Sequence, residues 1–276
     1  MPDILLHLLL PGLACLLYAA LGFHFWRTRW HLPVSTVTVR LWENLLLCLA
    51  LALHGISLYD LLFGDGGMRF SFSLALSLML WLAVLIHWLE NFRTRLDAMQ
   101  ALILPFAAIC TAFPLFFPQM RVIAHADALV FRLHFIAAML AYGLFTLAVL
   151  YAVLMGIVER KLHQNTLNSS LARLPPLLAM EGLLFHLIFS AFVLLTLVLG
   201  SGILFSEEIF GKPLIFDHKT LFGVASWLVF AALLLGRRIY GWRGRVALRW
   251  TITGFVFLLL AYVGSRFVTE VLLGRV

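Results

Sequence analysis

Charge is scarce in this sequence: only 12% of its 276 residues are Asp, Glu, Lys or Arg, whereas 63% are hydrophobic and the mean hydropathy is +1.02. A soluble domain of this length covers its surface with charged side chains, yet stretches such as Leu45–Ala52 and Leu183–Gly200 contain none. The composition therefore excludes a soluble fold, a disordered chain and a nucleic-acid-binding protein. We expect a chain that lies in a lipid bilayer and contacts membrane lipid.

Cysteine and the common catalytic motifs are also lacking. The three cysteines, Cys15, Cys48 and Cys110, lie in apolar segments without a Cys-x-x-Cys pair, which excludes a dithiol redox couple and covalent haem attachment. Without a His-x-x-x-His pair or a carboxylate cluster, a zinc site is disfavoured as well. No P-loop, dinucleotide fingerprint or Ser/His/Asp order is present, so the sequence gives no support to an enzymatic activity.

Long apolar runs fill the rest of the chain, and each is about 20 residues or longer, the length that a spanning helix requires. They predict an all-α membrane protein, a bundle of eight transmembrane helices that forms a single polytopic domain over residues 1–276. Turn-forming or charged residues separate the runs, for example Gly64–Gly67 and Pro114 with Pro118. The predicted spans are residues 4–25, 41–63, 71–92, 98–117, 126–158, 178–205, 218–236 and 246–272.

Basic residues are distributed unevenly between the two sides of this layout. Most of the 20 Lys and Arg residues fall on the side that follows the first span, and the side of both termini has few. Because cytoplasmic loops carry the excess of basic residues, both termini are predicted to lie outside, and the chain is predicted to be a multi-pass protein of the bacterial inner membrane.

Histidines within the spans are the most informative polar residues, because ionisable groups in a bilayer are costly and often functional. At about 1.5 Å of rise per residue, His87 and His186 fall at similar depths in the inner half. His54, His134 and His218 form an outer group. Paired imidazoles at matching depth are typical of haem ligation, but interhelical hydrogen bonds explain each ring equally well.

The helix that carries His134 also has small residues on the same face. Ala138, Ala141 and Tyr142 follow His134 at helical spacing, which leaves room for a flat ligand beside the imidazole. The same stripe would also let two helices pack closely. The sequence leaves both explanations open.

Two stretches resemble a known family. The segment Arg132–Gly143 resembles the histidine-led helix of the cytochrome c assembly (CcsA/CcmC-like) superfamily of haem-handling membrane proteins. The second stretch is similar to the Asp-Pro-Lys-Glu, tryptophan and Gly-Trp-Arg-Gly landmarks of that superfamily. It comprises Phe216–Thr220, Trp227, Gly241–Arg245 and Gly254–Phe255. Together they cover roughly the C-terminal half, and the layout is most similar to the YpjD and HemX branch of inner-membrane proteins.

The chain departs from this pattern where the family presents haem. The segment Ser206–Asp217 contains no tryptophan, and no histidine stands near Leu235–Gly236 or Gly264–Arg266, where the family has two. Among the family's ligands only His134 carries over, while His218 occupies the position of the family's proline. The resemblance implies a protein that binds or regulates haem rather than a complete holocytochrome synthase.

Our leading hypothesis is an inner-membrane protein that binds b-type haem noncovalently on its outer half and serves haem handling or cytochrome c biogenesis. His134 is one predicted axial ligand, and His218 or His54 is the other. Arg132 or Lys219 would hold a propionate. His87 and His186 would hold a second haem.

The rival hypothesis is a cofactor-free accessory subunit that binds a membrane-protein partner, possibly one linked to cation transport or resistance. Transport by this chain alone has less support, because the sequence shows no internal repeat.

Overall fold

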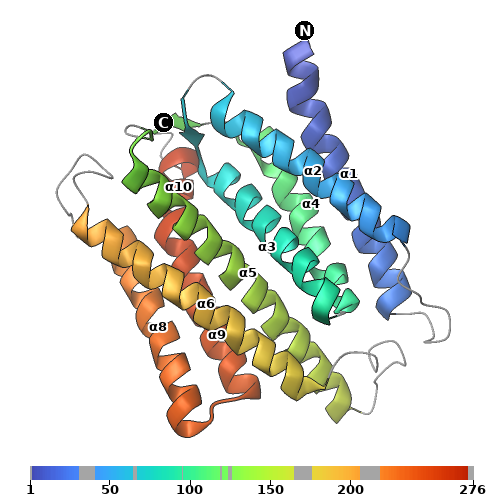
Figure 1. Cartoon of the computed structure of the whole chain (residues 1–276), viewed down its shortest axis with the longest axis vertical. Coiled ribbons are helices and arrows are strands. Elements are labelled where there is room, and N and C mark those ends of the chain that lie inside the picture. Colours follow the sequence, from blue (N-terminus) through green and yellow to red (C-terminus); the bar gives the residue numbers. More distant parts are fainter. Residues whose placement is uncertain are drawn as a thin grey trace.

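The computed structural model describes residues 2–30, 41–64, 67–94, 96–118, 120–123, 126–164, 176–205 and 218–272. This part of the chain contains eight helices that are long and apolar enough to cross a membrane. They lie side by side along a common direction (Figure 1). The predicted all-α membrane fold is therefore confirmed. The loop Ser206–Asp217, in which the family's tryptophans are missing, lies outside the described residues.

Each spanning helix runs opposite to the one before it. The spans are α1 (Pro2–Trp30), α2 (Leu41–Phe63), α3 (Phe72–Thr94), α4 (Gln100–Phe116), α5 (Leu129–His163), α6 (Leu177–Leu204), α8 (His218–Tyr240) and α9 (Gly244–Leu259). The short helix η2 (Asp97–Met99) precedes α4, and the last span continues through η4 (Leu260–Gly264), α10 (Ser265–Phe267) and η5 (Val268–Leu272). Helix α1 packs on α2 and α4, α3 on α4 and α5, α5 on α6 and α9, and α8 on α6 and α9.

The two ends of the bundle differ in charge. The start of α1 and the end of the last span lie at the same end, which we call the terminal end (Figure 1). We call the opposite end the basic end, because most basic side chains of the described residues lie there. They are Arg27, Arg29, Arg93, Arg160, Lys161, Arg237, Arg238, Arg243, Arg245 and Arg249.

Glycines allow the helices of the core to approach one another closely. The position of a Cβ on Gly143 of α5 would be 2.9 Å from Leu82 Cβ of α3, and that of a Cβ on Gly254 of α9 would be 2.8 Å from the Phe230 ring of α8. Phe230 is fully buried and stacks on Phe145 of α5, with 4.0 Å between the ring centroids. Backbone contact at these points replaces the side-chain layer found between most helices, as is usual in membrane bundles.

Gly254→Ala should destabilise the protein by about 1–3 kcal/mol, because the new methyl group overlaps a ring that Phe145 holds in place. Gly182→Ala in α6 is the matched control, since no heavy atom lies within 4 Å of its added Cβ. There, alanine should be neutral or stabilise the helix by up to about 1 kcal/mol. Thermal unfolding of both variants in detergent measures the difference. Equal midpoints would mean that the α8–α9 contact tolerates an added methyl group.

The structure differs from the predicted layout at several element ends. Helix α1 continues to Trp30, beyond the predicted residue 25, and Pro114 lies inside α4 rather than ending it. Two short strands, β1 (Arg69–Phe70) and β2 (Arg121–Val122), pair antiparallel outside the spans and were not predicted.

The last span is interrupted by the π-helical turns η4 and η5, which turn the Glu270 side chain back toward α3. One oxygen of this buried carboxylate accepts a hydrogen bond from the Phe72 backbone N–H at 3.1 Å. This hydrogen bond satisfies one of the backbone N–H groups that have no acceptor within the first turn of α3.

Candidate functional site

His134 lies in the second turn of α5, at the terminal end, and is half-buried. Its Nδ1 is 2.8 Å from the Ser201 hydroxyl of α6, and that hydroxyl donates its single proton to the Val198 carbonyl at 3.1 Å. The proton between the two side chains must therefore come from Nδ1 of the imidazole. In this neutral tautomer the lone pair is on Nε2, the arrangement seen in metal-ligating histidines whose other nitrogen is held by the protein.

The small-residue stripe beside His134 is used for helix packing. Ala141 is buried, and the Tyr142 hydroxyl donates a hydrogen bond to the Leu258 carbonyl of α9 at 2.8 Å. The imidazole instead faces α6 at Gly202, where an added Cβ would be 3.6 Å from His134 Cε1. The ring therefore packs against the end of α6 rather than along the stripe.

His218 and Lys219 begin α8 at the same end of the bundle, the former exposed and the latter half-buried. Helix α8 packs on α6, where the Cβ position of Gly223 is 3.4 Å from Leu199. Because Leu199 lies near the end of α6, the start of α8, which carries His218, lies at the same terminal end as Ser201 and His134.

Arg132 is exposed and lies two residues before His134 on α5. It donates to the Asp127 carboxylate at 3.0 Å and to the Ala126 carbonyl at 3.2 Å. An exposed ion pair of this kind is worth little and can be exchanged for another anion.

His54 lies apart from this group, in the core formed by α1 to α4, and is 1% exposed. Its Nε2 is 2.8 Å from the Ser77 hydroxyl, and its Nδ1 is 3.3 Å from the Thr111 hydroxyl, which itself donates to the Ala107 carbonyl. Both ring nitrogens thus join neighbouring helices. A ligand role for His54 would require these hydrogen bonds to break.

His87 and His186 both lie in the half of the bundle nearer the basic end, where Glu90 interacts with Tyr151 and with His186. The Tyr151 hydroxyl hydrogen-bonds to Glu90 and lies 3.1 Å from His87 Nδ1, so the tyrosine proton goes to the carboxylate and His87 donates to the tyrosine oxygen. Among the described residues, His87 Nε2 is buried without a hydrogen-bond partner. His186, exposed on α6, interacts electrostatically with Glu90.

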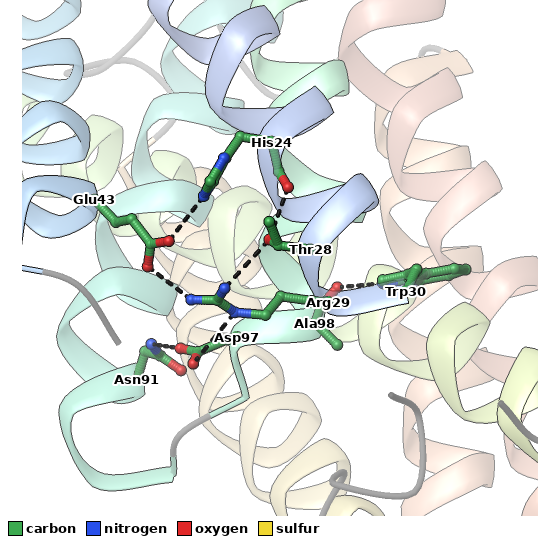
Figure 2. Close-up of polar contacts among 8 residues, drawn as sticks. All are labelled: His24, Thr28, Arg29, Trp30, Glu43, Asn91, Asp97 and Ala98. Carbon is green, nitrogen blue, oxygen red and sulfur yellow. Dashed lines mark hydrogen bonds and ion pairs between the residues drawn. The ribbon is translucent and has the colours of Figure 1, made fainter. Parts of the chain in front are cut away.

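A buried ionic cluster at the basic end was not predicted as a site. Figure 2 shows the Glu43 carboxylate of α2 between two side chains of α1, His24 at 2.8 Å and Arg29 at 2.7 Å. Arg29 Nε is also 3.9 Å from Asp97, which accepts a hydrogen bond from Asn91 of α3 at 2.8 Å. The sequence signal was an acidic residue at the start of one span with basic residues at the end of the preceding one. These contacts join α1, α2, α3 and η2.

Across the described ranges, no group of three or more His, Cys, Asp or Glu side chains is placed to hold a metal ion.

Comparison with known proteins identifies relatives of this arrangement. The family model described as cytochrome C assembly protein matches residues 42–273, so it leaves out α1. Inner membrane protein YpjD of Escherichia coli K12 is 30% identical over 228 residues, which cover 82% of this chain and 84% of YpjD. Cytochrome c biogenesis protein CcsA of Prochlorococcus marinus strain AS9601 is 38% identical over 88 residues, 32% of this chain and 28% of CcsA. No solved structure gives a significant match.

Proposed function

The chain belongs to the cytochrome c assembly protein family, and we propose that it binds b-type haem noncovalently at the terminal end of its bundle for haem handling or cytochrome c biogenesis. His134 and His218 would hold the haem iron through their imidazole nitrogens. The observation that carries the proposal is the hydrogen bond between His134 Nδ1 and Ser201, because it fixes the ring in the way that a second protein group fixes metal-ligating histidines.

The chemistry of the residues at this end fits haem. Imidazoles of α5 and α8 lie at this end, and His134 contacts the end of α6 at Ser201 and Gly202. Arg132 and Lys219 are cations at the same end, where they would pair with the propionates. Bound haem would supply the iron porphyrin that is delivered, stored or sensed, and the residues named here bind and orient it.

The chain is a multi-pass protein of the bacterial inner membrane, like its relative YpjD. We place its terminal end outside and its basic end in the cytoplasm, because basic residues accumulate on the cytoplasmic side of spans. The haem would then lie in the outer half of the membrane, on the side where cytochromes c are completed.

The absorption spectrum of the purified protein tests this function. Protein expressed with haem supplied, then washed free of loosely bound pigment, should show the Soret band and the α and β bands of a bis-imidazole haem. A colourless preparation would contradict the proposal. If that preparation also retained a second membrane protein, it would favour the cofactor-free accessory subunit.

A second haem site beside His87 of α3 is supported by the buried Nε2 of that residue, which has no hydrogen-bond partner among the described residues. An imidazole nitrogen without a partner in an apolar interior is costly, and an axial bond to iron would satisfy it. His87→Ala with His186→Ala should lower the haem content from two per chain to one, as measured by the pyridine haemochrome assay. An unchanged haem content would exclude this second site.

A further inference from the structure

A cavity of about 270 Å³ opens at the basic end, between α5, α6 and the start of α9. Its floor is apolar and is formed mainly by Ala152, Met155, Gly156 and Leu248. Its rim is charged and contains Glu159, Glu181 and Arg243. The cavity therefore takes a ligand that is apolar on one side and charged on the other.

Together with Arg237 and Arg245, which pair with the rim carboxylates, the mouth of the cavity carries more positive than negative charge. Glu181 forms an ion pair with Arg237 and lies 3.6 Å from Arg243 Nε, and Glu159 lies 3.5 Å from Arg245 Nε. Three guanidinium groups thus surround two carboxylates. Because the Glu181 charge is already balanced by Arg237, the side chain of Arg243, which is 61% exposed, leaves positive charge at the mouth. The ligand should therefore carry an anion.

The backbone holds this positive charge at the edge of the membrane. Arg243 stands in the turn between α8 and α9, next to Gly241 and Gly244, whose φ angles are +66° and +51°. These left-handed conformations favour glycine and let the chain reverse within three residues. The floor residues belong to membrane spans, so the cavity leads from the charged surface into the apolar interior.

We propose that this cavity binds the headgroup and the first acyl carbons of an anionic phospholipid. Arg243, supported by Arg245, pairs with the phosphate, and Met155 and Leu248 contact the upper part of the acyl chain. Basic pockets between helices at the membrane surface select acidic headgroups in this way. The site lies at the opposite end of the bundle from His134 and does not depend on the proposed haem function.

Native mass spectrometry of the full chain from detergent tests the proposal, with phosphatidylglycerol, phosphatidylcholine and inorganic phosphate added separately. The protein should retain phosphatidylglycerol in preference to phosphatidylcholine. Arg243→Gln should lower its retention roughly five-fold, the effect of one arginine near an acidic headgroup. Arg249→Gln, an exposed arginine of α9 that does not line the cavity, is the matched control and should change retention less than two-fold.

A third variant separates the cavity from diffuse surface charge. Met155→Trp fills the floor without changing any charge and should also lower phosphatidylglycerol retention. If it does not fold, the comparison of the two arginine variants decides alone. Equal losses in Arg243→Gln and Arg249→Gln, or displacement of the lipid by inorganic phosphate, would overturn the proposal. Because Arg243 is at the opposite end of the bundle from His134 and His218, a changed spectrum of the haem at the terminal end is not expected in any of these variants.

Discussion

His134→Ala should abolish the haem spectrum of the terminal end. The imidazole presents Nε2 from a ring that Ser201 holds in one tautomer, and alanine removes the ligand altogether. The loss of haem affinity should exceed the roughly 10–100-fold decrease that follows loss of an outer-shell partner. Titration of the purified apoprotein with haemin, followed at the Soret band, measures it. Unchanged bands in His134→Ala would exclude this residue as a ligand.

Three further variants show whether a loss of haem reflects ligation or damage to the fold. Ser201→Ala should retain the bis-imidazole bands while its affinity falls roughly 10–100-fold, because the ring keeps its ligand nitrogen but loses its orientation. His218→Ala should give a five-coordinate spectrum. His54→Ala should leave the spectrum unchanged and lower the thermal stability, because it removes the partner of the buried Ser77 hydroxyl, whereas Thr111 keeps its bond to the Ala107 carbonyl.

The contrast between His54 and His134 shows which features of such a site can be predicted from the sequence and which cannot. Both histidines lie in the outer group by depth, since depth follows from counting residues along a helix. The direction in which each imidazole points depends on which helix packs beside it. Counting residues along one helix gives no information about that neighbour. In the structure His54 faces Ser77 and Thr111, and His134 faces the end of α6.

The spans themselves were predictable because each depends only on its own composition. The ends of the spans were less predictable. The charges of Arg27 and Arg29 indicated a loop, yet α1 continues through them because the Glu43 and Asp97 carboxylates form ion pairs with Arg29. The pairing of β1 with β2 was missed because two residues carry no periodic pattern. In each case the prediction would have required knowing which residues from another part of the chain lie nearby.

Glu43→Ala should have the largest effect on stability, about 3–5 kcal/mol, because it breaks a buried ion pair and leaves one charge behind. Glu43 is 2% exposed and Arg29 is 8% exposed, so water cannot replace the lost partner. The remaining carboxylate, on Asp97, is 3.9 Å from Arg29 Nε and is already engaged by Asn91. The free energy of unfolding of a typical folded protein is only about 5–15 kcal/mol. Equilibrium unfolding in mixed micelles measures the change.

The double variant Arg29→Met with Glu43→Leu is the decisive control for this cluster. It removes both charges and fills their volume with apolar atoms, so it should be considerably more stable than Glu43→Ala. Helix α1 lies outside the residues that the family model matches, and the cluster joins it at its basic end to α2, α3 and η2. If the double variant is as unstable as Glu43→Ala, the ion pair itself contributes net stability. If Glu43→Ala unfolds like the unmodified protein, the cluster does not hold α1 in place.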